Sequence, residues 1–138
     1  MKRASAPILI GRGISRHAGV WAAGACPSRR ILLVSEPAVW RLHGAQVRAA
    51  LRRAGLKTEA YLLPRGGKAK TWAAVSGILN RLIRLGLGRD SALAALGGGA
   101  VTDAAGFAAA IYMRGIPCSA CPPRCWGRPT AESAARPE

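Results

Sequence analysis

Acidic side chains and aromatic rings are scarce in this chain of 138 residues. Six Asp and Glu stand against 21 Lys and Arg, which gives a formal net charge of +15 at pH 7. Such a charge raises the question of nucleic-acid binding. However, the basic residues are spread along the chain, and 5% aromatic residues are too few for a platform on which bases stack. The composition therefore argues against a nucleic-acid-binding protein.

Long hydrophobic runs are also missing. No apolar run approaches the roughly 18–20 residues that a membrane-spanning helix requires. The apolar stretch at residues 6–10, which follows Lys2 and Arg3, is too short for the hydrophobic region of a signal peptide. We therefore expect a soluble, cytoplasmic protein, in which the four cysteines stay reduced and need not form disulfides.

Strand and helix patterns alternate along the chain. Residues 31–34 and 92–96 are continuous apolar runs, as in strands buried on both faces. Weaker strand patterns cover residues 7–10 and 58–63. The alternation predicts an α/β fold, an open and mostly parallel sheet with flanking helices.

Three helices are expected to follow the last three strands. The first has Pro37 in its first turn, Leu42 on its buried face, and Gly55 at its end. The second places Ile83 on its apolar side. The third is rich in small residues and begins near residue 101. From residue 118 onward no periodicity remains, and residues 118–138 are expected to form an irregular tail.

A glycine triplet, Gly97-Gly98-Gly99, lies between the predicted strand at 92–96 and the third helix. In parallel sheets, ligands bind beyond the carboxyl ends of the strands. Glycines there allow close backbone approach to a phosphate, and the helix N-terminus supplies N–H donors. Asp103 is expected in the first turn, where it either accepts a hydrogen bond from a ligand or caps the helix, a contribution of about 0.5–2 kcal/mol.

The residues around the triplet form a longer pattern. Residues 97–109 read G-G-G-x-x-x-D-x-x-G-F-A-A, and residues 112–115 read Y-x-R-G. This pattern resembles the signature of the 3-dehydroquinate synthase family. Iron-type alcohol dehydrogenases and glycerol dehydrogenases share only the G-G-G-x-x-x-D part. Matches at residues 10–11, 33–36 and 64–71 extend the resemblance over nearly all of residues 7–117.

The resemblance implies a Rossmann-like, NAD-binding domain over residues 1–117. It also implies cofactor contacts by Glu36, Lys70, Gly98, Gly99, Val101, Thr102 and Asp103. Arg114 stands at the position of a substrate-contacting arginine. For Lys70 and Arg114 the alternative is a solvated charge at a helix end. Two departures are expected to weaken NAD binding: Gly67 replaces a glutamate, and Thr102 replaces a common glycine.

The activity that the resemblance implies is the conversion of 3-deoxy-arabino-heptulosonate 7-phosphate to 3-dehydroquinate and phosphate. This carbon–oxygen lyase reaction belongs to the shikimate route to aromatic amino acids. NAD oxidises a hydroxyl transiently, and a divalent metal, usually zinc, assists. The family holds its metal in a C-terminal helical domain, and its members dimerise. Here the only histidines, His17 and His43, match no such motif. We expect the helical domain and the metal ligands to be absent, and the chain to be inactive alone.

The tail differs from the family in a regular way. From Cys121 it reads C-P-P-R-C-W-G-R-P-T-A-E-S-A-A-R-P-E, where the family has V-P-T-T-L-L, then D-S, then V-G-G-K-T-G. With suitable synonymous codons, a shift of one base converts the tail into V-P-T-T-L-L-G-Q-A-D-S-G-V-G-G-K-T-G. This predicts a reading-frame slip near residue 117. The alternative is a small basic metal- or nucleic-acid-binding protein that uses Cys118, Cys121 and Cys125 as ligands.

Overall fold

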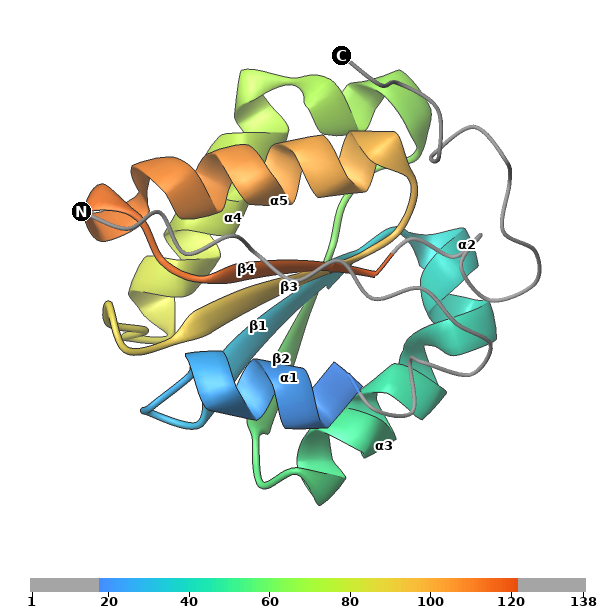
Figure 1. Cartoon of the computed structure of the whole chain (residues 1–138). Helices are drawn as coiled ribbons and strands as arrows, with labels where there is room; N and C mark the ends of the chain where they lie inside the picture. The colour runs from blue at the N-terminus through green and yellow to red at the C-terminus, as the bar shows by residue number, and fades with distance from the viewer. Residues whose placement is uncertain (1–17, 122–138) are drawn as a thin grey trace, which may run out of the picture.

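The computed structural model describes residues 18–121, which form one sheet with helices on both faces (Figure 1). The first half, in chain order, contains α1 (Ala18–Ala25), β1 (Arg30–Ser35), α2 (Pro37–Val39), the π-helical turn η2 (Trp40–Gly44), α3 (Ala45–Arg53) and β2 (Lys57–Leu62). The second half contains the 3-10 turn η3 (Gly66–Lys70), α4 (Trp72–Arg84), β3 (Ala92–Leu96), α5 (Gly99–Ile111), the 3-10 turn η4 (Tyr112–Arg114) and β4 (Cys118–Cys121).

The four strands lie in the order β2-β1-β3-β4, and every neighbouring pair is parallel. This confirms the predicted open, parallel α/β sheet. The register places Ser35, at the end of the central strand β1, beside Leu62 of β2 and Leu96 of β3. The carboxyl ends of these three strands therefore meet at one edge of the sheet.

Each face of the sheet has its own apolar core. Ile31 and Leu33 of β1 belong to the core that includes α1 and α3. The alternate residues Leu32 and Val34 belong to the core that includes α4 and α5. Figure 1 shows these two helix pairs on opposite sides of the sheet. Because successive strand residues point to opposite faces, burial on both sides explains why β1 is apolar throughout.

Two apolar residues predicted to be buried are exposed. Leu42 is 72% exposed because it lies in η2, where the wider π-helical turn changes the phase of the buried face. Ile83 is 63% exposed. The buried stripe of α4 runs through Val75, Ile78 and Leu82, and Ile83 falls just outside it.

One α-helix and one strand were not predicted. The short helix α1 consists mostly of small residues and packs against α3. Strand β4 lies inside the tail that was predicted to be irregular, and it pairs with β3 from Leu93 to Leu96. A ladder of backbone hydrogen bonds forms this edge strand without an apolar pattern, which is why the sequence did not indicate it.

Parts of the prediction lie outside the described residues, namely the strand at 7–10 and the tail at 122–138. Within residues 18–121, none of the helices combines the length and the apolar character needed to cross a membrane.

Candidate functional site

The carboxyl edge of the sheet contains a topological switch point between β1 and β3. The helices that follow β1 cover one face of the sheet, and α5, which follows β3, covers the other. The segments that leave β1 and β3 therefore turn to opposite faces at this edge, which is where parallel sheets bind ligands. The Ser35 hydroxyl donates a 2.7 Å hydrogen bond to the carbonyl oxygen of Leu96 and ties the two strands together there.

Gly97 is required by the packing of the chain itself. A Cβ at this position would lie 2.7 Å from the Cβ and Cγ2 of Val101, closer than atoms in a folded protein approach. The Val101 side chain is buried in the α4/α5 core. Any contact that Val101 makes with a ligand must therefore come from its backbone.

Gly98 and Gly99 are not required by internal packing. A Cβ on either residue would meet no neighbouring atom within 4 Å. The backbone of Gly98, with φ of −75°, is also open to other residues. The described part of the chain thus leaves free space beside both glycines, as close approach by a ligand would require.

Helix α5 begins at Gly99, so the predicted start near residue 101 is two residues too late. Asp103 therefore lies in the second turn, and the prediction that it lies in the first turn is wrong. Gly98 is the N-cap residue, and no side chain from residues 18–121 caps the helix, so the alternative role of Asp103 as a cap is also wrong. The first N–H groups of α5 have no intrahelical acceptor, and they remain available to an anion.

Thr102 is tethered to the glycine turn. Its hydroxyl donates to the carbonyl oxygen of Gly98 at 3.1 Å, and its backbone N–H donates to the same oxygen at 3.0 Å. Thr102, which stands where the family commonly has glycine, therefore fixes the orientation of the Gly98 peptide.

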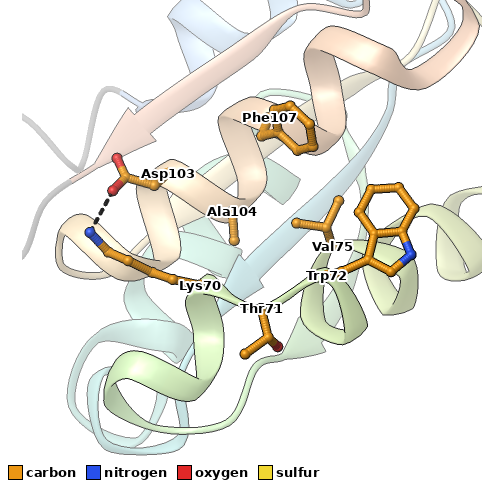
Figure 2. A pocket seen from close by; sticks show the side chains of 7 residues that line it. All are labelled: Lys70, Thr71, Trp72, Val75, Asp103, Ala104 and Phe107. Carbon is orange, nitrogen blue, oxygen red and sulfur yellow. Dashed lines mark ion pairs between the residues drawn. The ribbon is translucent and has the colours of Figure 1, made fainter.

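Lys70 and Asp103 form an ion pair between η3 and α5, with 2.8 Å between Nζ and Oδ2 (Figure 2). Lys70 is thus not a lone solvated charge. Thr71 caps α4 by accepting from the N–H of Ala74, and its hydroxyl donates to the carbonyl of Lys68 at 2.9 Å. Both side chains of the ion pair are exposed, so the pair contributes at most about 1 kcal/mol to stability.

A hollow of about 270 Å³ opens beside this ion pair, between the beginnings of α4 and α5. Trp72, 66% exposed, and Phe107, 51% exposed, line it together with Val75 (Figure 2). Sequence reasoning missed Trp72. The available signal was a large aromatic residue at the start of an amphipathic helix but outside its buried stripe.

Glu36 follows β1 directly, just as Gly97 follows β3. Because Ser35 and Leu96 are paired in the sheet, Glu36 and Gly97 leave neighbouring strands at the same edge. The Glu36 side chain is half-buried and does not cap α2. The structure therefore gathers all seven of the predicted cofactor residues at the carboxyl edge of the sheet.

Arg114 lies at the other end of α5, which spans about 20 Å. The structure does not bring it to the glycine turn. Met113 and Arg114 have left-handed backbones, with φ of 49° and 66°, which is unfavourable for side chains other than glycine. The Tyr112 hydroxyl anchors this turn by donating to the carbonyl of Leu87 at 2.7 Å, and burial raises the pKa of Tyr112.

The described cysteines do not form a metal site. Cys118 and Cys121 are three residues apart in β4, so they point to opposite faces of the sheet. Although Cys118 is exposed, surrounding atoms desolvate its thiol and raise its pKa to about 11. Among residues 18–121, no three His, Cys, Asp or Glu side chains gather as metal ligands would. Cys125 lies outside the described residues, and nothing in β4 favours the metal-binding alternative.

The sequence comparisons with known proteins agree on one family. A family described as 3-dehydroquinate synthase N-terminal matches residues 60–128. The 3-dehydroquinate synthase of Pelotomaculum thermopropionicum is 41% identical over 112 residues, which are 81% of this chain and 30% of that protein. The enzyme of the same name from Pelobacter propionicus is 46% identical over 90 residues, 65% of this chain and 25% of that protein. The chain therefore spans about 30% of the length of such relatives.

Two solved structures share the fold. The 2-epi-5-epi-valiolone synthase of Streptomyces hygroscopicus, with NAD+ and Zn2+ bound, gives a TM-score of 0.74 at 25% identity. The match covers 88% of this chain and 33% of that one. A 2-deoxy-scyllo-inosose synthase, complexed with carbaglucose-6-phosphate, NAD+ and Co2+, gives 0.72 at 22% identity, over 81% and 31% of the two chains.

Proposed function

Because this chain belongs to the 3-dehydroquinate synthase family, we propose that residues 1–117 form the NAD-binding domain of such an enzyme. The observation that carries the proposal is the glycine turn at the switch point. There Gly98 and Gly99 adjoin free space at the N-terminus of α5, and within residues 18–121 no side-chain cap bond forms at the N-cap residue Gly98. Such a turn accepts the pyrophosphate of a dinucleotide.

The residues around the turn fit the rest of the cofactor. Glu36, directly after β1, offers a carboxylate to a ribose hydroxyl, and Asp103 offers a second one from α5. Lys70 brings a positive charge to the same edge and is held there by its ion pair with Asp103. Thr102 keeps the Gly98 carbonyl turned back into the helix, so that N–H groups rather than carbonyls face the free space. A bound NAD would supply reversible hydride transfer at this edge of the sheet.

The described residues do not fit the divalent metal of the family, since no set of three metal-ligating side chains occurs among residues 18–121. We therefore assign no step through a metal to this part of the chain. In the proposed enzyme, the substrate is 3-deoxy-arabino-heptulosonate 7-phosphate and the products are 3-dehydroquinate and phosphate. We propose that the 138-residue chain supplies cofactor binding and does not catalyse this reaction alone.

Three further assignments belong to the same proposal. Arg114 contacts the substrate, at a place separate from the glycine turn of its own chain because the length of α5 lies between them. The complete enzyme is a cytoplasmic dimer, as proposed from the family resemblance. Residues 118–138 are encoded out of frame. Strand β4 is compatible with this because its ladder with β3 uses backbone groups and its side chains are mostly exposed.

Calorimetric titration of the purified chain with NAD+ tests cofactor binding. We expect saturable binding, and we expect Gly98→Ala to weaken it about tenfold or more, a loss of about 1.4 kcal/mol. A methyl group there enters the free space beside the turn without an internal clash, so the thermal stability should not fall.

Gly106→Ala is the matched control, because Gly106 lies on the same helix and a Cβ there also meets no neighbouring atom. Its affinity for NAD+ should equal that of the wild type. Saturable binding that both alanine variants retain in full would place the dinucleotide elsewhere and refute the assignment of the glycine turn.

A further inference from the structure

A second hollow, of about 230 Å³, lies between β2 and the last turns of α4. It is lined by Tyr61, Gly77, Asn80, Arg81 and Arg84. Helix α4 has 13 residues and spans about 20 Å, and its other end adjoins the glycine-turn site. The second hollow is therefore separate from the proposed NAD site.

A close approach between a tyrosine and a glycine forms the floor of this hollow. The Tyr61 hydroxyl lies against Gly77, so closely that a Cβ on Gly77 would overlap it. The Tyr61 ring packs against the α4/α5 core. Within residues 18–121, no hydrogen-bond acceptor is found for the Tyr61 hydroxyl, which leaves a donor at the hollow.

The two arginines of the hollow are poorly neutralised. The only carboxylate that pairs with either of them, among the described residues, is Glu59, whose Oε2 lies 3.8 Å from Nη2 of Arg81. That separation is too long for a hydrogen bond. The Nε of Arg81 is buried without an acceptor, and Arg84 is exposed. Within the described residues, only Arg81 of these two arginines has a carboxylate nearby, which leaves a net positive charge at the hollow.

Helix geometry accounts for only part of this arrangement. Basic residues in the last turn of a helix are stabilised by the helix dipole, which explains why Arg81 and Arg84 are acceptable there. The dipole does not explain why the buried Nε of Arg81 lacks an acceptor within residues 18–121. A buried donor without an acceptor is unfavourable, so an acceptor from outside the chain would stabilise this region.

We propose that this hollow binds a phosphoryl group, either of free phosphate or of a phosphate monoester. A guanidinium fork matches phosphate oxygens in two parallel hydrogen bonds. Arg81 and Arg84 supply such forks, and the Tyr61 hydroxyl and the Asn80 amide supply neutral donors. Glu59 opposes the anion, and its weak contact with Arg81 is the one that phosphate would replace.

Titration of the 138-residue chain with inorganic phosphate, followed by calorimetry, tests the proposal. The double variant Arg81→Gln, Arg84→Gln should bind phosphate at least about tenfold more weakly than the wild type. The matched control is Arg52→Gln, Arg53→Gln, which removes the same charge from exposed positions of α3 on the other side of the sheet. The control should keep the wild-type affinity. Equal weakening in both double variants, or no saturable binding to the wild type, would overturn the proposal.

Tyr61→Phe gives a second, milder variant that keeps the ring in the core and removes only the hydroxyl. It should weaken phosphate binding about threefold to tenfold, the loss of roughly one hydrogen bond, and wild-type affinity in this variant would remove Tyr61 from the site. A parallel titration with ribose 5-phosphate distinguishes free phosphate from a monoester as the preferred ligand, and either preference supports a phosphoryl site. NAD+ affinity should be unchanged in Arg81→Gln, Arg84→Gln, so the outcome is independent of the proposed cofactor site.

Discussion

Gly97 and Gly98 are neighbours in the chain, yet they are glycines for different physical reasons. Gly97 faces Val101 across the first turn of α5, where no Cβ fits. Gly98 faces free space and has a backbone that other residues adopt. Gly97 is therefore needed for the stability of the domain, whereas Gly98 leaves room for the proposed ligand.

Substitution of Gly97 tests this difference. Gly97→Ala should destabilise the domain by about 1–3 kcal/mol, the usual cost of overpacking, because the new methyl group would lie 2.7 Å from Val101. Urea unfolding measures the change, with Gly98→Ala as the control that should unfold at the wild-type midpoint. Equal midpoints for Gly97→Ala and the wild type would show that α5 moves aside without cost.

At the scale of elements, the two ends of α5 differ in structure. Its N-terminus carries the glycine turn, and its C-terminus continues into the left-handed residues Met113 and Arg114. The hydrogen bond from Tyr112 to Leu87 holds the second end against the segment before β3. Together with the backbone bonds from Gly115 to Tyr112 and from Ile116 to Ala109, this buried contact stabilises a backbone that Met113 and Arg114 would otherwise avoid.

Removing that hydroxyl gives a prediction with a pH dependence. Tyr112→Phe should lower the free energy of unfolding by about 0.5–1.5 kcal/mol at neutral pH. Burial raises the folded-state pKa of Tyr112 above its unfolded value, so the wild type loses stability relative to the variant as the pH rises above about 10. Thermal unfolding of both proteins between pH 7 and 11 measures the difference. A difference that stays constant up to pH 11 would contradict the assigned burial of this hydroxyl.

The sequence predicted those elements that are buried on both faces or strongly periodic. Strands β1 and β3 are apolar runs, and the sheet and its binding edge follow from their alternation with helices. Strand β4 and helix α1 could not be predicted, because one depends on backbone pairing and the other consists mostly of small residues. The exposure of Leu42 depends on a π-helical turn, which no residue pattern in the sequence predicts.

The candidate site was predictable in a similar, partial way. The glycine triplet and Asp103 were identified from their place between a strand and a helix, and Lys70 from the family resemblance. The structure gathers them at one edge. The pairing of Lys70 with Asp103 joins residues far apart in sequence, so it required the fold. The separation of Arg114 from the glycine turn, by contrast, follows from the predicted third helix, because that helix lies between them.

At the scale of the whole molecule, the proposal makes the described domain the cofactor half of a larger site. The chain spans about 30% of the length of its relatives. The proposed frame slip concerns the tail alone, since one inserted base would restore V-P-T-T-L-L and the motifs that follow it.

Restoring the frame tests the slip and the proposed inactivity together. Insertion of one base before codon 121 of the natural gene should extend the reading frame into a longer chain. That product should form 3-dehydroquinate from the heptulosonate phosphate, whereas the 138-residue chain should form none above background. A stop codon soon after the insertion would refute the slip, and dehydroquinate formation by the 138-residue chain would refute the inactivity.

The central position of β1 also has a kinetic consequence. Ser35 is synthesised early, but its hydrogen-bond partner Leu96 follows 61 residues later, after β2 and α4 have been added. The edge between β1 and β3 can therefore form only after β3 has been synthesised and has paired with β1. Such long-range parallel pairing slows folding, so the glycine turn is among the last parts of the nascent domain to acquire its final geometry.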